Sequence, residues 1–200
     1  MGETKTVTSF SRVLAITVTT VDATDEDLMR AYCAGDEKAF RELFDRYAEP
    51  LFRAVQRLLA DESAARDVVQ QAFLQMHRAR NDFDPKRKFR SWIYTIALNL
   101  ARDERRRRGR RREDGLADEP RHASDDTPDQ HVEAVQSRHR MAKAMERLSR
   151  EQREVIILHW YEGLSFPEIA HATGAGLSAV KVRAHRAYKK LREFLPPDTS

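Results

Sequence analysis

The sequence predicts an all-α protein: two helical domains joined by a flexible linker, the second domain containing a helix-turn-helix. Apolar residues recur at three- and four-residue steps, as one buried face of a helix requires, and no segment alternates with the period of two that marks a half-buried strand. A charged, proline-containing stretch over 109–130 separates the two helical parts. The length of 200 residues suits one or two domains.

Composition excludes several classes of protein. Charged residues make up 34% of the chain and hydrophobic residues 40%, and Cys33 is the single cysteine, so neither an intramolecular disulfide nor a cysteine-cluster metal site can form. No apolar run approaches the roughly 18 residues that span a bilayer, so we expect no membrane insertion. Residues 1–24 are interrupted by Arg12 and several threonines, which makes them a poor signal peptide and suggests either a mobile leader or a misassigned start site. We expect a cytoplasmic protein without a cofactor.

The first predicted domain covers 25–108. The stripe of its long helix consists of Phe40, Leu43, Phe44, Tyr47, Leu51, Val55 and Leu58. After the break "ADES", where Asp61 or Ser63 could cap a helix, the pattern resumes with Val69, Ala72, Phe73 and Met76.

A second break in this domain lies at "NDFDPK", because Pro85 disfavours helix at Asp84. The segment "FRSWIYTIALNLARDERRRR" then returns to helical spacing. The arginine run that follows is either a solvated helix end or a nucleic-acid arm, and its composition alone favours neither. The acidic stretch after it lacks large apolar side chains and predicts a flexible linker over 109–130.

The second predicted domain covers 131–195, with 196–200 as a tail. Its first stripe consists of Val132, Val135, His139, Ala142, Met145 and Leu148. Ser149 and Gln152 form a capping-box pattern, with apolar surface from Val155, Ile156, Leu158 and Trp160 before Gly163 ends the helix. Ser165 fits as the next N-cap, with Pro167 in the first turn and Glu168 at the third helical position. "ATGAG" breaks the chain, and Ser178 opens the final helix.

The final helix has two different faces on a helical wheel. Its apolar side consists of Leu177, Val180, Ala184, Ala187 and Leu191. Opposite it lie Ser178, Val182, His185 and Lys189, flanked by Lys181 and Arg186. Cations with one small apolar side chain suit the DNA major groove, where they meet phosphates, guanine edges and a thymine methyl. Solvated faces usually mix charges, but no acid occurs between Lys181 and Arg192. The short helix and tight turn before it complete a helix-turn-helix, and predict DNA binding.

Five segments, in order, resemble one family. "AMERLSREQREVIILHWYEG" and "LSFPEIAHATGAGLSAVKVRAHRAYKKLRE" resemble the promoter-binding domain 4 of bacterial RNA polymerase sigma factors of the sigma-70 family. "GDEKAFRELFDRYAEPLFR", "ARDVVQQAFLQMHRA" and "FRSWIYTIALNLARDERRRR" resemble the opening, the polymerase-docking helix and the promoter-melting helix of sigma domain 2. Two domains and a linker resemble the extracytoplasmic-function (ECF, group IV) class. The resemblance spans roughly 25–195 and implies promoter-specific transcription initiation, not an enzyme.

The resemblance also implies roles for residues that contact DNA. The family's −35 contacts fall on Lys181, Val182, Arg183, His185 and Arg186; the wheel turns Arg183 sideways, toward a phosphate, and adds Ser178, Lys189 and Lys190. The family's base-capturing loop corresponds to 83–89, where Phe83, Lys86, Arg87 and Lys88 mix an aromatic with cations, as single-strand binding favours. Asn99 stands near the first opened bases of the −10 element. An alternative interpretation makes Phe83, Phe89 and Trp92 simply core residues, which is favoured for the last two.

Protein partners follow from the same resemblance. The docking surface for a coiled coil of the largest subunit of core RNA polymerase corresponds to Asp67, Gln70, Gln71 and Leu74. The family usually has an acid where Gln71 stands, and its base-capturing loop is often rich in glycine and serine rather than basic. An anti-sigma protein is also an expected partner, and the active protein is expected at the bacterial nucleoid.

Two alternative functions fit the sequence less well. A helix-turn-helix regulator acting without core polymerase explains 149–192 but leaves the first domain without a role. A nucleic-acid enzyme needs convergent carboxylates or metal ligands, and the seven histidines are scattered without ligand spacing.

Overall fold

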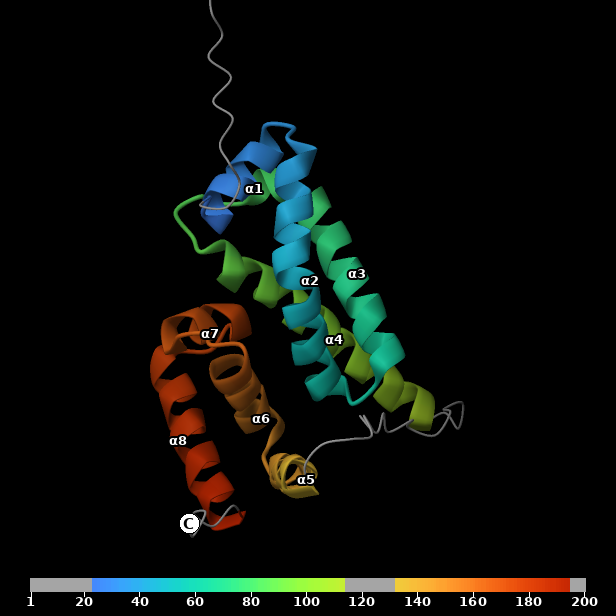
Figure 1. The fold of residues 1–200 in the computed structure, drawn as a ribbon, viewed down its shortest axis with the longest axis vertical. Helices are drawn as coiled ribbons and strands as arrows, with labels where there is room; N and C mark the ends of the chain where they lie inside the picture. The colour runs from blue at the N-terminus through green and yellow to red at the C-terminus, as the bar shows by residue number, and fades with distance from the viewer. Residues whose placement is uncertain (1–22, 114–131, 195–200) are drawn as a thin grey trace, which may run out of the picture.

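The computed structural model describes residues 23–113 and 132–194, and all regular elements in these two ranges are helices (Figure 1). The all-α fold class is thereby confirmed. The first range forms the N-terminal bundle, and the second forms the C-terminal bundle. The predicted leader, most of the predicted linker and the tail lie outside the described residues.

Three long helices and one short one build the N-terminal bundle. These elements are α1 (Asp25–Cys33), α2 (Glu37–Leu59), α3 (Glu62–Arg78), the 3₁₀ turn η1 (Arg80–Asp82) and α4 (Phe89–Glu113). Side chains of Thr24, Asp36 and Asp61 accept hydrogen bonds from the free backbone N–H groups at the starts of α1, α2 and α3, which fixes where each helix begins. Of the two caps considered for α3, Asp61 is the observed one.

The core of this bundle contains most of the predicted apolar stripe, with one correction. Leu43, Tyr47, Leu51 and Val55 are buried, but Phe44 is 41% exposed. The α2 helix carries more apolar residues than one buried face can hold. Phe44 lies at the edge of that face, where it lines a groove between α2 and α3. Phe44 therefore belongs to a surface groove.

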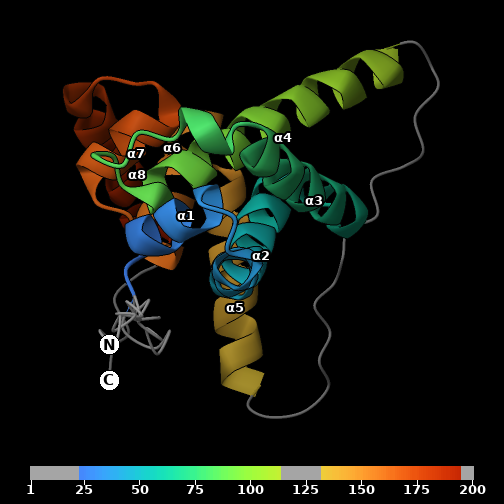
Figure 2. The same cartoon turned by 90° about the horizontal axis from the view of Figure 1, so that it is seen from above.

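The melting helix α4 extends beyond the predicted domain end at residue 108. It continues through Gly109 and the arginine run to Glu113, so the first residues of the predicted linker are helical. Its last turns project beyond the other helices of the bundle (Figure 2). Alternating local ion pairs, such as Arg107 with Glu104, offset the repulsion within the run.

The C-terminal bundle contains α5 (Val132–Glu146), α6 (Arg150–Ile156), the π-helical turn η2 (Ile157–Tyr161), α7 (Phe166–Thr173) and α8 (Leu177–Phe194). The capping boxes predicted at Ser149 and Ser165 are confirmed, as is the end of the helix at Gly163, which has a φ of 65°. The stripe predicted for α5 is only partly confirmed. Leu148 is buried and Met145 half-buried as predicted, whereas His139 and Ala142 are exposed and Ala144 is buried instead. The side chains of Val132 and Val135 lie outside those that the structure describes.

Two apolar residues of this bundle are also more exposed than predicted. Trp160 is 64% exposed, because the π-helical turn rotates it out of the register of α6. Leu177 is 40% exposed, because α8 begins there, one residue earlier than predicted, where the chain has only just left the turn. The remaining core stripe of α8, from Val180 to Leu191, is buried as predicted.

The two bundles pack against each other (Figure 1). One continuous cluster of buried apolar side chains runs from α1–α4 into α6, η2, α7 and α8. A second, smaller cluster joins α5 to α6 and α8. Within the described ranges, no helix is long and apolar enough to cross a membrane.

Candidate nucleic-acid and protein interfaces

The outward face of α8 is exposed and cationic. Six of the predicted DNA contacts lie on it with exposed side chains: Ser178, Lys181, Val182, His185, Arg186 and Lys189. Lys190 is exposed beside them and Arg183 is half-buried. None of the described residues forms an ion pair with these lysines and arginines, so the cations are available to an external anion. Val182, 47% exposed, is the apolar group at the centre of this face.

The turn between α7 and α8 sets the orientation of this face. Ser165 begins α7 with a reciprocal cap to Glu168, and Gly174 ends it in the left-handed conformation with a φ of 68°. A residue with a Cβ is strained at that φ, so glycine permits the tight turn. Burial of Ile169 and Ala172 in α7, and of Val180 and Ala184 in α8, then locks the two helices together. The arrangement is a helix-turn-helix with the second helix free on one side.

The loop before α4 presents cations but not the predicted aromatic ring. Lys86, Arg87 and Lys88 are exposed, whereas Phe83 is buried and packs edge-on against Phe89 and at a tilt against Trp92. The expectation that Phe83 offers an exposed ring is wrong, because its ring packs with those of Phe89 and Trp92 in the core. Asp84 accepts a hydrogen bond from the Lys86 backbone N–H at 3.0 Å, which holds the basic loop in a turn.

Asn99 lies on α4 with an exposed side chain. Its Oδ1 lies 3.4 Å from the Arg102 guanidinium, which donates to it. The loop cations and Asn99 are thus about three helical turns apart along α4, with Arg102 one turn further.

Two grooves flank the predicted polymerase-docking residues on α3. Asp67, Gln70, Gln71 and Leu74 are all exposed, and Leu74 is 41% exposed despite being apolar. A groove of 1090 Å³ lies on one side, with a floor of Phe40, Phe44, Phe73 and Leu74. A smaller groove of 520 Å³ on the other side is lined by Asp67, Gln71 and α4 arginines. Gln70 lines both grooves, so the docking residues form a ridge between them.

Sequence reasoning missed the apolar groove and Phe44 within it. A signal was present, since apolar residues at 40, 43, 44, 47 and 51 cover a wider arc of α2 than one neighbouring helix can bury.

The arginine run has two parts. Arg106, Arg107 and Arg108 pair with acids of the same helix, and Arg108 also reaches Asp61 at 2.9 Å. Hydrogen bonding to Arg108 holds the pKa of the Asp61 carboxyl below its ordinary value. Arg110 and Arg111 are exposed, and no ion pair to them occurs in the described part of the chain. The arginines from 106 to 108 therefore stabilise the helix through ion pairs, whereas Arg110 and Arg111 are available to bind an anion.

No cluster that could hold a metal occurs in the chain from 23 to 113 and from 132 to 194, where no three His, Cys, Asp or Glu side chains converge.

Comparison with known families matches both bundles. The family model for sigma-70 region 2 matches residues 43–111, and the model for sigma-70 region 4 matches residues 138–191. RNA polymerase sigma factor NccH of Alcaligenes xylosoxydans is 38% identical over 176 residues, which cover 86% of this chain and 94% of that protein. Sigma factor CarQ of Myxococcus xanthus is 34% identical over 172 residues, covering 84% and 95%.

Two solved structures are similar over most of their length. CnrH in complex with the cytosolic domain of CnrY is 32% identical, with a TM-score of 0.66 over 88% of this chain and 99% of CnrH. Sigma factor RpoE of Bartonella quintana, in complex with the anti-sigma factor NepR, is 26% identical, with a TM-score of 0.67 over 80% and 99%.

Proposed function

The chain belongs to the extracytoplasmic-function class of sigma-70 factors and directs promoter-specific transcription initiation, and we propose how its residues divide that work. Residues 131–195 act as domain 4 and recognise the −35 element. Residues 25–108, extended by the α4 helix to 113, act as domain 2, which docks on core polymerase and melts the −10 element. A helix-turn-helix regulator acting alone is set aside, because the match to region 2 accounts for the N-terminal bundle.

The −35 element is recognised by α8. The observation that carries this assignment is the exposed, acid-free face from Ser178 to Lys189 on the second helix of a helix-turn-helix. Lys181, His185 and Arg186 offer donors to base edges, and Val182 suits a thymine methyl. Arg183, Lys189 and Lys190 lie toward the edges of the face, where phosphates run.

The −10 element is melted against α4 and its preceding loop. Lys86, Arg87 and Lys88 attract the displaced single strand, and Asn99 offers a donor and an acceptor to an unstacked base. Extruding a base costs a few kcal/mol of stacking energy, which such contacts offset. Because Phe83 is buried against Phe89 and Trp92, it supports the loop from beneath instead of stacking on a base.

Core polymerase docks on the α3 ridge. A helical coiled coil of the largest subunit would contact Asp67, Gln70 and Gln71, and an apolar side chain of it would enter the groove at Leu74 and Phe44. Exposed apolar groups rimmed by polar ones are typical of protein-binding surfaces, which supports this role.

An anti-sigma protein is a further proposed partner. Support comes from similarity to RpoE, which was solved in complex with the anti-sigma factor NepR. A protein that works with core polymerase and promoter DNA would act in the bacterial cytoplasm, at the nucleoid when active.

The test is run-off transcription with core polymerase on a library of random promoters. The templates that yield RNA should share two sequence blocks, one for each domain, and yield none when the chain is omitted. If the chain binds selected DNA but gives no RNA with core polymerase, the alternative regulator is correct.

A further inference from the structure

We propose that Glu26 of α1 is a positioning residue for promoter melting, because it supplies from another helix the hydrogen-bond acceptor that the start of α4 lacks. It holds the basic loop, Lys86 to Lys88, in the conformation that meets the unpaired −10 strand. This inference rests on the proposed role of that loop in melting. It adds a role for α1, which precedes the residues matched by the family model for sigma-70 region 2.

The start of α4 departs from two rules of helix ends. The first backbone N–H groups of a helix have no partner within it, and a Ser, Thr, Asp or Asn side chain usually accepts from them. Here Lys88 stands directly before Phe89, the first residue of α4, and no acid occurs in the first turn. Lys86, Arg87 and Lys88 also place three cations at the positive end of the helix dipole, where cations are unfavourable. The local sequence therefore opposes a helix that begins here.

Glu26 offsets both departures. Its Oε1 accepts a hydrogen bond from the Phe89 backbone N–H at 3.0 Å and lies 4.0 Å from Lys88 Nζ. The Glu26 side chain is 19% exposed and that of Lys88 is 72% exposed, so Glu26 is half-buried while Lys88 extends into solvent. One carboxylate thus satisfies a free N–H of α4 and places a negative charge at the positive end of the helix.

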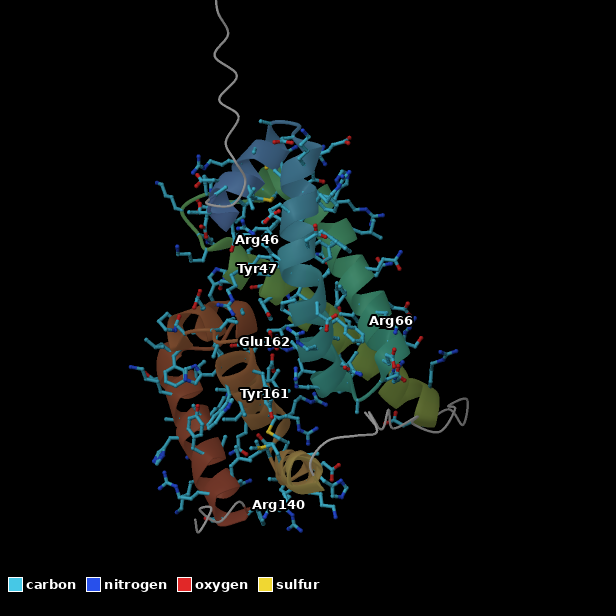
Figure 3. All side chains as sticks on the ribbon, in the orientation of Figure 1. Arg46, Tyr47, Arg66, Arg140, Tyr161 and Glu162 are labelled. Carbon is cyan, nitrogen blue, oxygen red and sulfur yellow. The ribbon has the colours of Figure 1, made fainter. Side chains whose placement is uncertain are left out.

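Neighbouring contacts fix the position of Glu26. Asp25 pairs with Arg46 of α2 at 2.9 Å and accepts a hydrogen bond from the Tyr47 hydroxyl. The Tyr47 ring packs edge-on against Phe89, with 5.2 Å between the ring centroids. Figure 3 shows Arg46 and Tyr47 on the side of α2 that faces α1 and the start of α4. Buried apolar residues of α1 anchor the helix in the same core. Glu26 therefore has a fixed place relative to α4.

The basic loop is held at both of its ends. Where it begins, Asp84 Oδ1 accepts from the Lys86 N–H at 3.0 Å, and the Asp84 carbonyl accepts from the Arg87 N–H at 2.9 Å. Where it ends, Glu26 holds the N–H of Phe89. The three cations between these points are exposed. A fixed backbone reduces the conformational entropy that the loop loses on binding, so this arrangement favours capture of a strand.

A purely electrostatic role for Glu26 predicts an effect of the opposite sign. A carboxylate beside three cations lowers their attraction for a nucleic-acid strand, so its removal would tighten binding. A positioning role predicts weaker binding when the acceptor is lost, even though a negative charge is lost with it. Substitutions that remove the charge with or without the acceptor separate the two roles.

Three substitutions make this separation. Glu26→Ala removes both the charge and the acceptor, and Glu26→Gln removes the charge but keeps an Oε1 that can accept from Phe89. Asp82→Ala is the matched control, because it removes an equal charge from the segment that leads into the loop. The Asp82 side chain is exposed and accepts no hydrogen bond from any of the described residues. Circular dichroism and urea unfolding would establish that each variant is folded in the assay.

The measurement is fluorescence anisotropy of the labelled non-template −10 strand of a selected promoter, with holoenzyme assembled from core polymerase and each variant. Glu26→Ala should weaken binding about three- to tenfold, because a smaller fraction of the chain holds the competent loop. Glu26→Gln and Asp82→Ala should bind at least as tightly as the wild type. The salt slope should stay unchanged in Glu26→Ala, which keeps every loop cation. It should fall by about 0.7 in Lys86→Ala, which loses a phosphate contact.

Equal affinities of Glu26→Ala and Glu26→Gln, whether above or below that of the wild type, would overturn the positioning role. If Glu26→Ala is not folded, Glu26→Met removes the same groups with a side chain of similar length and should weaken binding to the same extent. If Lys86→Ala weakens binding and Glu26→Ala does not, only the positioning role is wrong. If Lys86→Ala changes neither the affinity nor the salt slope, the −10 assignment of the loop is contradicted, and the role of Glu26 fails with it.

Discussion

Asp61 serves both the start of α3 and the attachment of α4. Its Oδ1 accepts from the Ala64 N–H at 2.8 Å and its Oδ2 pairs with Arg108 at 2.9 Å. Asp61→Asn keeps a good N-cap but loses the ion pair, so the free energy of unfolding at pH 7 should fall by about 0.5–1 kcal/mol.

The same substitution should show a defined pH dependence. Because the folded pKa of Asp61 lies below the unfolded value of about 3.9, its stabilisation is fully present above that value and is lost as pH falls through the folded pKa. Urea unfolding should therefore give a gap between wild type and Asp61→Asn at pH 7 that narrows below about pH 4. A gap of constant size would show that the ion pair does not act through ionisation of Asp61.

On α8, residues at the centre of the outward face should determine sequence preference, whereas residues at its edges should contribute affinity for any duplex. Arg186→Ala or His185→Ala should cost about 1–3 kcal/mol on the preferred −35 site and relax the preference at one or two base pairs. Lys189→Ala or Lys190→Ala should weaken binding to all duplexes alike and lower the salt slope by roughly one per phosphate contact. Anisotropy of the full chain on matched and scrambled duplexes over a salt series measures both. A uniform loss from both groups would make α8 an electrostatic clamp without base recognition.

Single residues were predictable where a local rule determines them. The caps Asp61, Ser149 and Ser165 follow from short-range hydrogen bonding, which the sequence displays directly. The exposures of Phe44 and Trp160 were not predictable in this way. A helical wheel shows which residues share a side, but not how far a neighbouring helix covers that side, nor where a π-helical turn shifts the register.

The helix α4 and the loop before it should act in promoter melting and not in the initial binding of duplex DNA. Asn99→Ala and Lys86→Ala alter exposed side chains, so duplex −35 binding and core binding should remain intact. Open-complex formation, measured by permanganate reactivity of unpaired thymines, should fall. A pre-melted bubble template should restore activity, and an equal loss on that template would place the defect elsewhere.

Helices themselves were predictable, but their ends were less so. Every predicted helix in 25–108 and 149–192 occurs, because the apolar periodicity there is strong. The arginine run was assigned in part to the linker, yet α4 continues to Glu113, because ion pairs such as Arg107–Glu104 neutralise it along the helix. In α5, His139 and Ala142 of the predicted stripe are exposed, because Met141, Ala144 and Met145 form the side of the helix that packs in the cluster with α6 and α8.

Across the whole molecule, the division into two bundles was predictable and their packing was not. Composition alone indicates a break near 109–130. The pairs that join the bundles, such as Arg102 with Glu154, are separated by 52 residues and follow no local pattern. They could be recognised only after folding had placed one face of α4 opposite three elements of the other bundle.

The most direct test of the two-element mechanism is run-off transcription by core polymerase with wild-type or Arg186→Ala chain, on a selected promoter and on the same promoter with its −35 block scrambled. For the wild type, scrambling should lower RNA yield by about five- to 150-fold, the loss expected from about 1–3 kcal/mol of base contacts. For Arg186→Ala, yield on the intact promoter should already be low, and scrambling should lower it by a distinctly smaller factor. Equal fold-losses for the two proteins would contradict recognition of the −35 element by α8.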